Sequence, residues 1–378
     1  MRILVDIGHP GHVHLFKNFA RNMQENGHQL FFTCRKREFV VHLLESEGFC
    51  YKSFGRYRHT RTGKIFGLLR YNLLMLMVAL RFKPDIFLSH GSIYAAQIAW
   101  LLGKPNISME DTGNMEQIRL YRPFTKAMLV PYSLPQDFGP KQIKYQGVHE
   151  LHYLHPHYFK PSSEIYTYLG IDENTPYCIM RFVSWGASHD YGQNGFSCEE
   201  KREIIDYLSS RMQIFITSEI PLPSEYRKYQ IKIPPEKIHH ALAFADLVVS
   251  EGATIASECA VLGTPAIYVN SLVCYYLEDQ QQYGLVFNHR NGKHVLSRAK
   301  ELIEDHYKSL NQQNRKRYLQ QMINPTPFLV WFIENYPESF GIMKENPDFQ
   351  FHFHSERMSH SYGRPLDPQK EALDSESV

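Results

Sequence analysis

One segment of the chain, residues 245–270 (ADLVVSEGATIASECAVLGTPAIYVN), joins a turn of small residues to an acidic side chain one helical turn later. Residues 247–250 form an apolar run typical of a strand, and residues 255–262 show a helical pattern that the Gly-Thr-Pro at 263–265 ends. A small-residue turn that opens a helix directs N–H groups and the positive end of the helix dipole at one point, which suits a phosphate or pyrophosphate. Glu258 is then within reach of a ribose diol beside that phosphate. The alternative is an ordinary turn followed by a solvated glutamate.

Polar side chains also follow two strands predicted in the first half of the chain. His90-Gly91-Ser92 comes after one of them, and Ser92 is placed to cap the next helix. Glu110 and Asp111 come directly after the other. Because the carboxyl ends of parallel strands meet at one edge of a sheet, both loops are expected to face the same cleft. The carboxylates could act as a base or bind sugar hydroxyls, and a helix N-cap with a solvated acid is the alternative.

The first predicted strand runs into the loop GHPGHVH at residues 8–14. This spacing is not G-x-G-x-x-G, which disfavours a nicotinamide or flavin site. A histidine has the right free pKa to accept a hydroxyl proton near neutral pH, so the loop is a candidate source of a general base. Because the chain has 20 histidines, a merely solvated loop histidine is the alternative.

Two strands predicted in the second half also end in polar residues. The strand 177–182 runs into small and hydroxyl-bearing residues that suit a second contact with a diphosphate, and the strand 214–217 ends at Ser218 and Glu219. Trp185 in the first of these loops either stacks on a base or sugar or simply packs. The candidate binding residues of that loop are Ser184, Trp185, Gly186, Ala187 and Ser188.

These loops need a scaffold of parallel strands, and the hydrophobic pattern predicts one. Strands and helices alternate from residue 2 to residue 131. The run 145–159 (YQGVHELHYLHPHYF) breaks this rhythm and is predicted to be a linker, and the alternation restarts at residue 177. We therefore expect an α/β protein with two Rossmann-like doubly wound domains that face a cleft.

The expected boundaries follow from this alternation. Residues 1–150 form an N-terminal Rossmann-like domain and residues 165–325 a C-terminal one. A closing helix at 326–340 is expected to pack back across the cleft. Residues 341–378 are polar and rich in His, Ser, Glu and Pro, which is typical of a poorly ordered tail.

Composition excludes several classes of protein. A hydrophobic content of 43% in 378 residues supports two cores of ordinary size. A net charge of +2 argues against a protein that binds nucleic acid by neutralising phosphates. The six cysteines show no C-x-x-C spacing, so neither a disulfide framework nor a zinc site is predicted and a reducing cytosol fits best. Neither a signal peptide nor an apolar stretch long enough to span a membrane is evident.

Two further stretches leave alternatives open. Residues 65–82 (IFGLLRYNLLMLMVALRF) are densely apolar between basic residues. They form either a buried helix of the first domain, which we favour, or an interfacial patch that touches an anionic membrane. No metal site is predicted from the linker histidines, because they have no acidic partner at a fixed spacing; they are His149, His152, His155 and His157.

The string SEGATIASECAVLGTPAIYV resembles the donor-nucleotide segment of GT-B glycosyltransferases, in particular the N-acetylglucosaminyltransferase of lipid II synthesis. In those enzymes a small-residue turn approaches the phosphates of the nucleotide sugar, and a glutamate holds the ribose hydroxyls. The resemblance implies that Gly252, Ala253 and Thr254 line the phosphate site and that Glu258 holds the ribose.

Other loops extend the resemblance. The loop 8–14 is similar to the Gly-Gly-His loop of that enzyme, whose histidine reaches the reaction centre, and His12 is in register with it. An acid-containing loop and an acidic-Gln element that meets the donor sugar have counterparts here as well. The bulky Trp185 departs from the small residue expected at its place. The implied catalytic residues are His12, Glu110 and Asp111, and the implied binding residues include Gly8, His9, Gly11, His90, Gly91, Ser92, Asp279 and Gln280.

Across residues 1–335 the chain resembles the GT-B-like group known as domain-of-unknown-function family 354. The strings that carry this match are IGHPGHVHLFKN, the HGS and MEDTGN loops, RFVSWGASHD and the donor segment. That group is related to the glycosyltransferase above and to the UDP-N-acetylglucosamine 2-epimerases, so the resemblance specifies the fold more firmly than the reaction.

The expected activity is a metal-independent, cofactor-free transfer of sugar from a nucleotide-diphosphate sugar to an acceptor hydroxyl, in surface or lipid-linked glycan synthesis. The expected location is the cytoplasm, with peripheral contact at the inner face of the membrane. A nucleotide-sugar 2-epimerase is one alternative, although those enzymes have a Thr-His-Arg-type motif where this chain reads Phe-Val-Ser-Trp at 182–185. A non-catalytic nucleotide-sugar-binding protein is the other.

Overall fold

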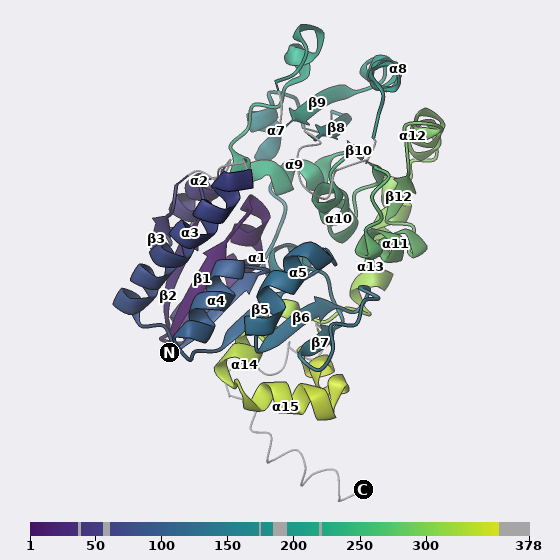
Figure 1. Ribbon diagram of the computed structural model, residues 1–378. Coiled ribbons are helices and arrows are strands. Elements are labelled where there is room, and N and C mark those ends of the chain that lie inside the picture. The colour runs from purple at the N-terminus through teal and green to yellow at the C-terminus, as the bar shows by residue number, and fades with distance from the viewer. Residues whose placement is uncertain (37–38, 56–60, 174, 184–194, 219–220, 355–378) are drawn as a thin grey trace, which may run out of the picture.

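The computed structural model describes residues 1–36, 39–55, 61–173, 175–183, 195–218 and 221–354 (Figure 1). Two parallel sheets, each with helices on its faces, make up this part of the chain. The first sheet has the strand order β3-β2-β1-β4-β5-β6-β7 and the second β12-β11-β10-β8-β9. The expected α/β architecture of two Rossmann-like units is confirmed.

The first sheet consists of seven strands that pair in parallel throughout. Their apolar side chains are buried because helices cover both faces, which explains the near-continuous hydrophobic runs in the sequence. The strands are β1 (Arg2–Ile7), β2 (Gln29–Cys34), β3 (Tyr51–Ser53), β4 (Ile86–His90), β5 (Asn106–Met109), β6 (Ala127–Pro131) and β7 (Gln142–Tyr145). The helices that follow them are α1 (Pro10–Glu25), α2 (Val40–Ser46), α3 (Arg61–Phe82), α4 (Ile93–Leu101) and α5 (Met115–Tyr121).

The second sheet has five parallel strands. They are β8 (Tyr177–Phe182), β9 (Gln213–Ser218), β10 (Leu247–Ser250), β11 (Ala266–Val269) and β12 (Val286–His289). The helices of this half are α7 (Ile165–Leu169), α8 (Cys198–Ser209), α9 (Ile238–Phe244), α10 (Ala253–Leu262), α11 (Tyr275–Gln282), α12 (Val295–Glu304) and α13 (Lys308–Leu319).

The order of strands reverses direction once in each sheet, between β1 and β4 in the first and between β8 and β10 in the second. Loops at such a reversal diverge to opposite faces and leave a crevice at the carboxyl ends of the strands, where ligands of doubly wound proteins bind. The loops after β1, β4 and β10 are therefore the ones that the fold offers to a ligand.

The run 145–159, which the sequence predicted to be a linker, is largely buried. It contains the short helix α6 (Leu151–Leu154), which packs on α1 and on α10 and so contacts both halves of the molecule. His149, Glu150 and His152 in this run are at most 7% exposed. The segment is therefore a buried element between the two sheets.

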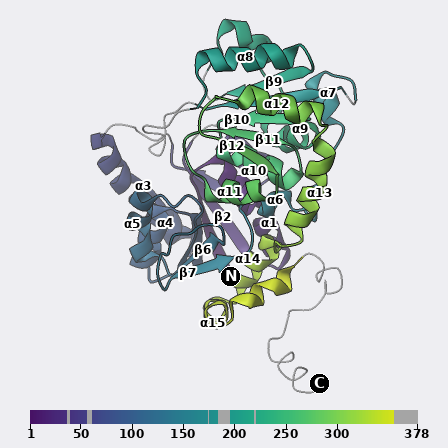
Figure 2. The same ribbon diagram turned by 90° about the vertical axis from the view of Figure 1, so that its right-hand side faces the viewer.

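The chain returns to the first half after α13. Helix α14 (Pro325–Glu334) packs on α1 and α6, and its residues Phe328 and Phe332 lie in the core beneath the first sheet. Figure 2 shows α14 and α15 in yellow beside the first domain.

The expectation of a poorly ordered tail from residue 341 is wrong for residues 341–353, and residues 355–378 lie outside the described part of the chain. Helix α15 (Glu338–Glu345) and the 3-10 helix η5 (Pro347–Phe353) continue the fold, and Phe353 is buried. Within the described residues, no helix combines the length and the apolar character needed to cross a bilayer.

Candidate active site at the meeting of the two sheets

The turn after β10 leaves the first N–H groups of α10 without a side-chain cap. Gly252 is the N-cap residue and has no side chain to accept from them. Thr254 is exposed, and Gly252 and Ala253 are partly so, which keeps this end of the helix accessible. Accessible, uncapped N–H groups at a helix N-terminus suit an anion, and the assignment of these three residues to a phosphate site stays a prediction.

Glu251, which the sequence analysis overlooked, organises this turn. Its carboxylate is fully buried and accepts the N–H groups of Val183 and Phe196, each at 3.1 Å. Lys201 of α8 lies 3.1 Å from the same carboxylate. Glu251 therefore fixes both ends of the loop between β8 and α8 against the turn before α10. Its place directly after an apolar strand was the available signal.

Glu258 is buried and hydrogen-bonded rather than solvated. It is 5% exposed, and its Oε1 accepts the hydroxyl of Tyr153 at 2.8 Å and bonds with His239 Nε2 at 2.9 Å. These partners belong to α6 and α9, so Glu258 ties three elements together one turn from the phosphate candidate.

In the loop after β1, the tautomer and the protonation state of His12 are defined by its surroundings. His9 caps α1, since its Nδ1 accepts from the Gly11 N–H at 3.2 Å. The Gly8 N–H donates to Nδ1 of His12 at 3.2 Å, which places the proton of the neutral ring on Nε2. Burial, and next the neighbouring His90, hold the pKa of His12 well below its ordinary value, so the ring is neutral at pH 7.

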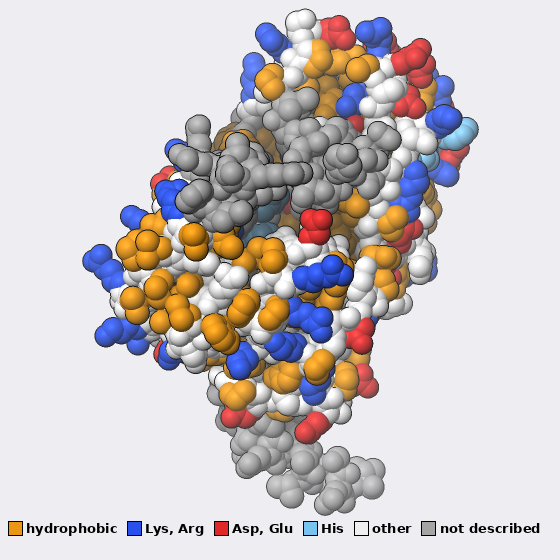
Figure 3. Space-filling view, in the orientation of Figure 1, with side chains coloured by type: hydrophobic (Ala, Val, Ile, Leu, Met, Phe, Trp, Pro, Cys, Tyr) orange, Lys and Arg blue, Asp and Glu red, His pale blue; other side chains and the backbone are white. Residues whose placement is uncertain are grey.

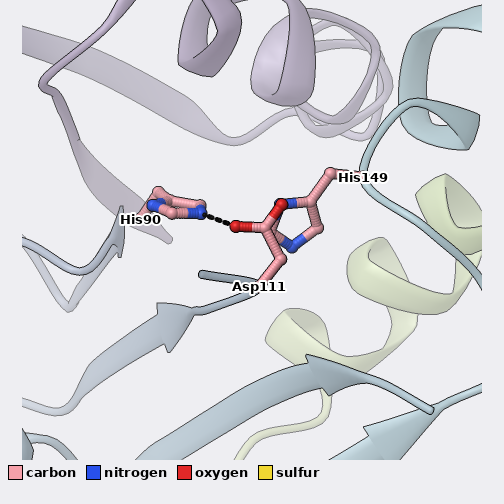
Figure 4. Close-up of side chains that lie close together, drawn as sticks. All are labelled: His90, Asp111 and His149. Carbon is pink, nitrogen blue, oxygen red and sulfur yellow. Dashed lines mark hydrogen bonds and ion pairs between the residues drawn. The ribbon is translucent and has the colours of Figure 1, made fainter. Parts of the chain in front are cut away.

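His90, Asp111 and His149 form a hydrogen-bonded triad (Figure 4). Nε2 of His90 lies 2.9 Å from Oδ1 of Asp111, and Nδ1 of His149 lies 2.9 Å from Oδ2. The ring of His90 also lies 4.5 Å from the ring of His12. The triad thus joins the ends of β4 and β5 to the buried segment between the sheets. Asp111 is the acidic partner of His149 that was not evident from the spacing of the linker histidines.

Charges within the triad shift the pKa values of Asp111 and His90 in opposite directions. Burial alone would raise the pKa of Asp111, but the charges of His149 and His90 hold it well below its usual range. Burial alone would lower the pKa of His90, and Asp111 raises it above its ordinary value. The carboxylate is therefore ionised across the physiological range.

The three side chains are also close enough for a metal ion, with their donor atoms within 4.8 Å of one another. Each oxygen of Asp111 already lies 2.9 Å from a histidine nitrogen, whereas Nε2 of His149 is buried without a hydrogen-bond partner. We interpret the triad as a hydrogen-bonded group, and the expectation that no metal is needed stays a prediction.

Glu110 holds its own loop in place. Oε1 accepts from the N–H groups of Thr112 and Gly113 at 2.8 and 3.1 Å, and Oε2 accepts from the Tyr121 hydroxyl at 2.6 Å. Both oxygens are committed inside the protein, where Glu110 is 2% exposed. This geometry supports a positioning role for Glu110 and leaves Asp111 as the acid that faces the histidines.

The loop after β4 is shaped by Gly91 and Ser92. Ser92 caps α4 as predicted, accepting from the Ala95 N–H at 3.2 Å, and donates to Asp6 at 2.6 Å. Gly91 has φ of +59°, and a Cβ there would lie 3.2 Å from the Gln117 amide. Glycine is needed at this position for both reasons.

The candidates on α11 face other protein groups. The Tyr132 hydroxyl from the end of β6 donates to Asp279, so a contact joins the two halves there. Gln280 is fully buried and donates to Ser257 Oγ of α10 at 2.9 Å. Ser218 is the last residue of β9. The candidates Ser184, Trp185, Gly186, Ala187, Ser188 and Glu219 lie outside the described residues.

Glu150 is a second residue that sequence reasoning missed. It lies in the buried segment between the two sheets and is 4% exposed. Burial, followed by the charge of Asp111, raises its pKa to about 8. Two neighbouring carboxyl groups are therefore held in opposite protonation states, the arrangement that acid–base sites use. Its position inside a presumed linker concealed it.

The two parallel sheets and the similarity to solved structures define a protein of the GT-B fold class. The chain matches the family described as "Protein of unknown function (DUF354)" over residues 1–336, and it belongs to that family. A curated relative, the uncharacterized protein MJ0665 of Methanocaldococcus jannaschii, is 22% identical over 283 residues, which cover 70% of this chain and 80% of that protein.

Solved structures with the same fold come from two kinds of enzyme. The S. aureus MnaA–UDP complex is similar with a TM-score of 0.64 and 12% identity, over 89% of this chain and 97% of that one. The UDP-GlcNAc 2-epimerase of Neisseria meningitidis bound to UDP-GlcNAc has a TM-score of 0.58 and 14% identity, over 91% of this chain and 99% of that one. The glycosyltransferase SsfS6 of Streptomyces sp. SF2575 has a TM-score of 0.54 and 14% identity, over 89% of this chain and 100% of that one. At these identities the similarity shows the fold.

Proposed function

We propose that this protein is a glycosyltransferase that moves a sugar from a nucleoside-diphosphate sugar to an acceptor hydroxyl. The observation that carries the proposal is that the chain holds both an uncapped α10 after a strand of the second sheet and a cluster of His12 with the His90–Asp111–His149 triad after strands of the first. The accessible N–H groups of α10 suit the diphosphate, and a helix N-terminus stabilises the charge that develops on a leaving phosphate. That solved structures of this fold hold UDP and UDP-GlcNAc supports a nucleotide-sugar donor.

In this reaction the acceptor oxygen attacks the anomeric carbon, and the bond from that carbon to the diphosphate breaks. The diphosphate leaves with the electron pair, and the hydroxyl proton moves to His12, which is neutral at pH 7 and can therefore accept it. The 3.2 Å hydrogen bond from Gly8 N–H to Nδ1 is released, or the ring proton exchanges so that Nε2 is free. His90, held by Asp111, lies against the charged ring that results.

The acceptor that we propose is a glycan or a lipid-linked glycan precursor, reached from the cytoplasm at the inner face of the membrane. Glu258 is proposed to bind the ribose through the edge of its carboxylate that Tyr153 and His239 do not use. The candidates Ser184, Trp185, Gly186, Ala187 and Ser188, which lie outside the described residues, are proposed as a second contact with the diphosphate.

A nucleotide-sugar 2-epimerase is the second candidate, and a specific observation favours it. The pKa values of Asp111 and Glu150 are displaced in opposite directions, and the charge of Asp111 contributes to the raised pKa of Glu150. Such a pair can remove a proton from one face of a sugar carbon and return one to the other face. Incubation with UDP-N-acetylglucosamine alone separates the two functions, because an epimerase forms product without an acceptor.

The test of the proposal is a thermal-shift screen of nucleoside diphosphates and their sugars, with Glu258→Gln as the variant. A ligand at 100 times its Kd adds about 2.7 kcal/mol of stability. We expect a pyrimidine nucleoside diphosphate to raise the melting temperature. Loss of a hydrogen bond between the ribose and the Glu258 carboxyl group should weaken the affinity of this ligand roughly 10- to 100-fold in the variant.

The matched control is Glu304→Gln, since Glu304 is an exposed glutamate of α12. Its affinity should equal that of the wild type. If no nucleoside diphosphate or its sugar shifts the melting temperature, the proposed donor is wrong. If the ligands bind but neither transfer nor epimerisation occurs with any acceptor tried, a non-catalytic binding protein is the better description.

A further inference from the structure

Helix α3 is apolar on two faces. Its residues Tyr71, Met75 and Ala79 are buried against the first sheet and α4. A second stripe, three or four residues apart and so on one face of the helix, points to solvent. Its members are Leu69 (64% exposed), Leu73 (57%), Met77 (51%) and Leu80 (57%). The expectation of a buried helix therefore holds for one side of α3 only.

Helix α4 extends this surface. Trp100 and Leu101 at its end are 61% and 58% exposed. A hollow of ≈ 430 Å³ runs between the two helices, and its apolar walls are Leu73, Leu76, Ile98, Trp100, Leu101 and Phe124. We call the exposed residues Leu69, Leu73, Met77, Leu80, Trp100 and Leu101 the α3–α4 face. Figure 3 shows hydrophobic side chains gathered over α3 and α4, with Lys and Arg at the edges.

Basic residues predominate over acidic ones in this region. Residues 61–109 include six Lys and Arg but a single acidic residue, Asp85, whereas the whole chain carries a net charge of only +2. Arg70, Arg81, Lys83 and Lys104 are exposed. Basic side chains around an apolar surface attract anionic lipid headgroups within a Debye length. Monomeric proteins rarely leave large contiguous apolar surfaces uncovered.

We propose that the α3–α4 face docks on an anionic lipid bilayer, with its Leu, Met and Trp side chains inserted at the headgroup boundary. Long apolar side chains, a tryptophan and a basic rim are the composition of interfacial membrane sites. No described helix spans a bilayer, so this contact is peripheral. The inference deepens the proposed function, because such docking would bring the active site to a lipid-linked acceptor.

The test is flotation of the full chain with vesicles. We expect binding to vesicles that contain phosphatidylglycerol, weaker binding at high salt, and little binding to pure phosphatidylcholine. The double variant L73E/M77E should reduce the bound fraction at least tenfold. Both positions are exposed, so these substitutions leave the core of the fold untouched.

The matched control places the same charges on apolar residues of the second half, V273E/L310E, where the side chains are 47% and 45% exposed. Its binding should stay within twofold of the wild type. Lipids with a quencher in the upper acyl chain should reduce tryptophan fluorescence in the wild type and not in Trp100→Phe. Flotation that is the same in both double variants, or no binding of the wild type, overturns the proposal.

A second copy of the chain is the competing occupant of this face. Light scattering decides between them: a wild-type dimer that L73E/M77E converts to a monomer, without vesicle binding, makes the surface a subunit interface. Nucleotide binding of L73E/M77E should equal that of the wild type. Vesicle binding without any nucleotide binding would reject the proposed function and keep this inference.

Discussion

At the scale of single residues, Asp111 and Glu150 show how surroundings give one functional group two states. Asp111 accepts from two histidines, which stabilise its charge, whereas Glu150 is buried beside that same charge. The first is ionised at neutral pH, and the second keeps its proton up to a pKa of about 8. Neither state follows from the amino acids alone.

Asp111→Asn should disable turnover. An amide keeps the shape, but it loses the charge and offers one acceptor oxygen to two histidines, so one of these loses its partner. We expect kcat to fall at least 100-fold with nucleotide affinity within about threefold, the range typical of general acid–base groups. Nucleotide titration and initial rates measure the two effects. Asp172→Asn, at an exposed acid, is the control, and equal rates in both variants would refute the role.

Glu150→Gln should change how stability depends on pH. Because its folded pKa of about 8 lies above the ordinary 4.5, the stabilising effect of the bound proton is complete below pH 4.5 and is lost as the pH rises through 8. The variant has no such loss. Between pH 4.5 and 9 its free energy of unfolding should therefore rise relative to that of the wild type by roughly 3 to 5 kcal/mol. Urea unfolding across this range is the measurement, and parallel pH profiles would contradict the expectation.

At the scale of elements, each candidate loop is fixed by contacts from outside itself. The turn before α10 is held by Glu251 against the β8 and α8 ends of a neighbouring loop. The loop after β5 is held by Glu110 and by Tyr121 of α5. Such supports leave the first N–H groups of α10 and the triad in fixed positions before a ligand arrives, which is what binding a diphosphate requires. Helix α3 differs, because one of its faces supports the sheet and the other is unpartnered among the described residues.

At the scale of the whole molecule, the late helices close the first domain. Phe328 of α14 packs against Tyr145 and Phe353, with ring centroids 6.0 and 5.7 Å away, and is 1% exposed. Thr326 of the same helix donates to the His152 carbonyl at 2.9 Å, so α14 also buttresses the segment that carries His149 and Glu150. The closing helix is thus part of the N-terminal core.

Phe328→Ala should therefore destabilise the protein strongly. Removing a buried phenylalanine ring costs about 3–5 kcal/mol because it leaves a cavity in a packed core. The midpoint of urea unfolding should fall accordingly. Leu310→Ala on α13, where the side chain is 45% exposed, should cost under about 1 kcal/mol. Similar midpoints for the two variants would show that α14 is not structural.

The sequence by itself determined the alternating strands and helices, the two sheets and the turn at Gly252, because these depend on local hydrophobic period and turn chemistry. It also indicated Asp111, Ser92 and Glu258 as residues at strand ends or on the first turns of helices. Local pattern reaches no further than one element and its neighbours along the chain.

Only the tertiary structure decided which of these residues meet. The partners of Asp111 are 21 and 38 positions away, at His90 and His149, and Glu258 bonds with Tyr153, 105 positions away. The buried segment at 145–159 looked like a linker because its apolar residues serve two domains at once and follow no single period. Side chains brought together by packing acquire their charge states there, since burial and neighbouring charges, rather than sequence, shift a pKa.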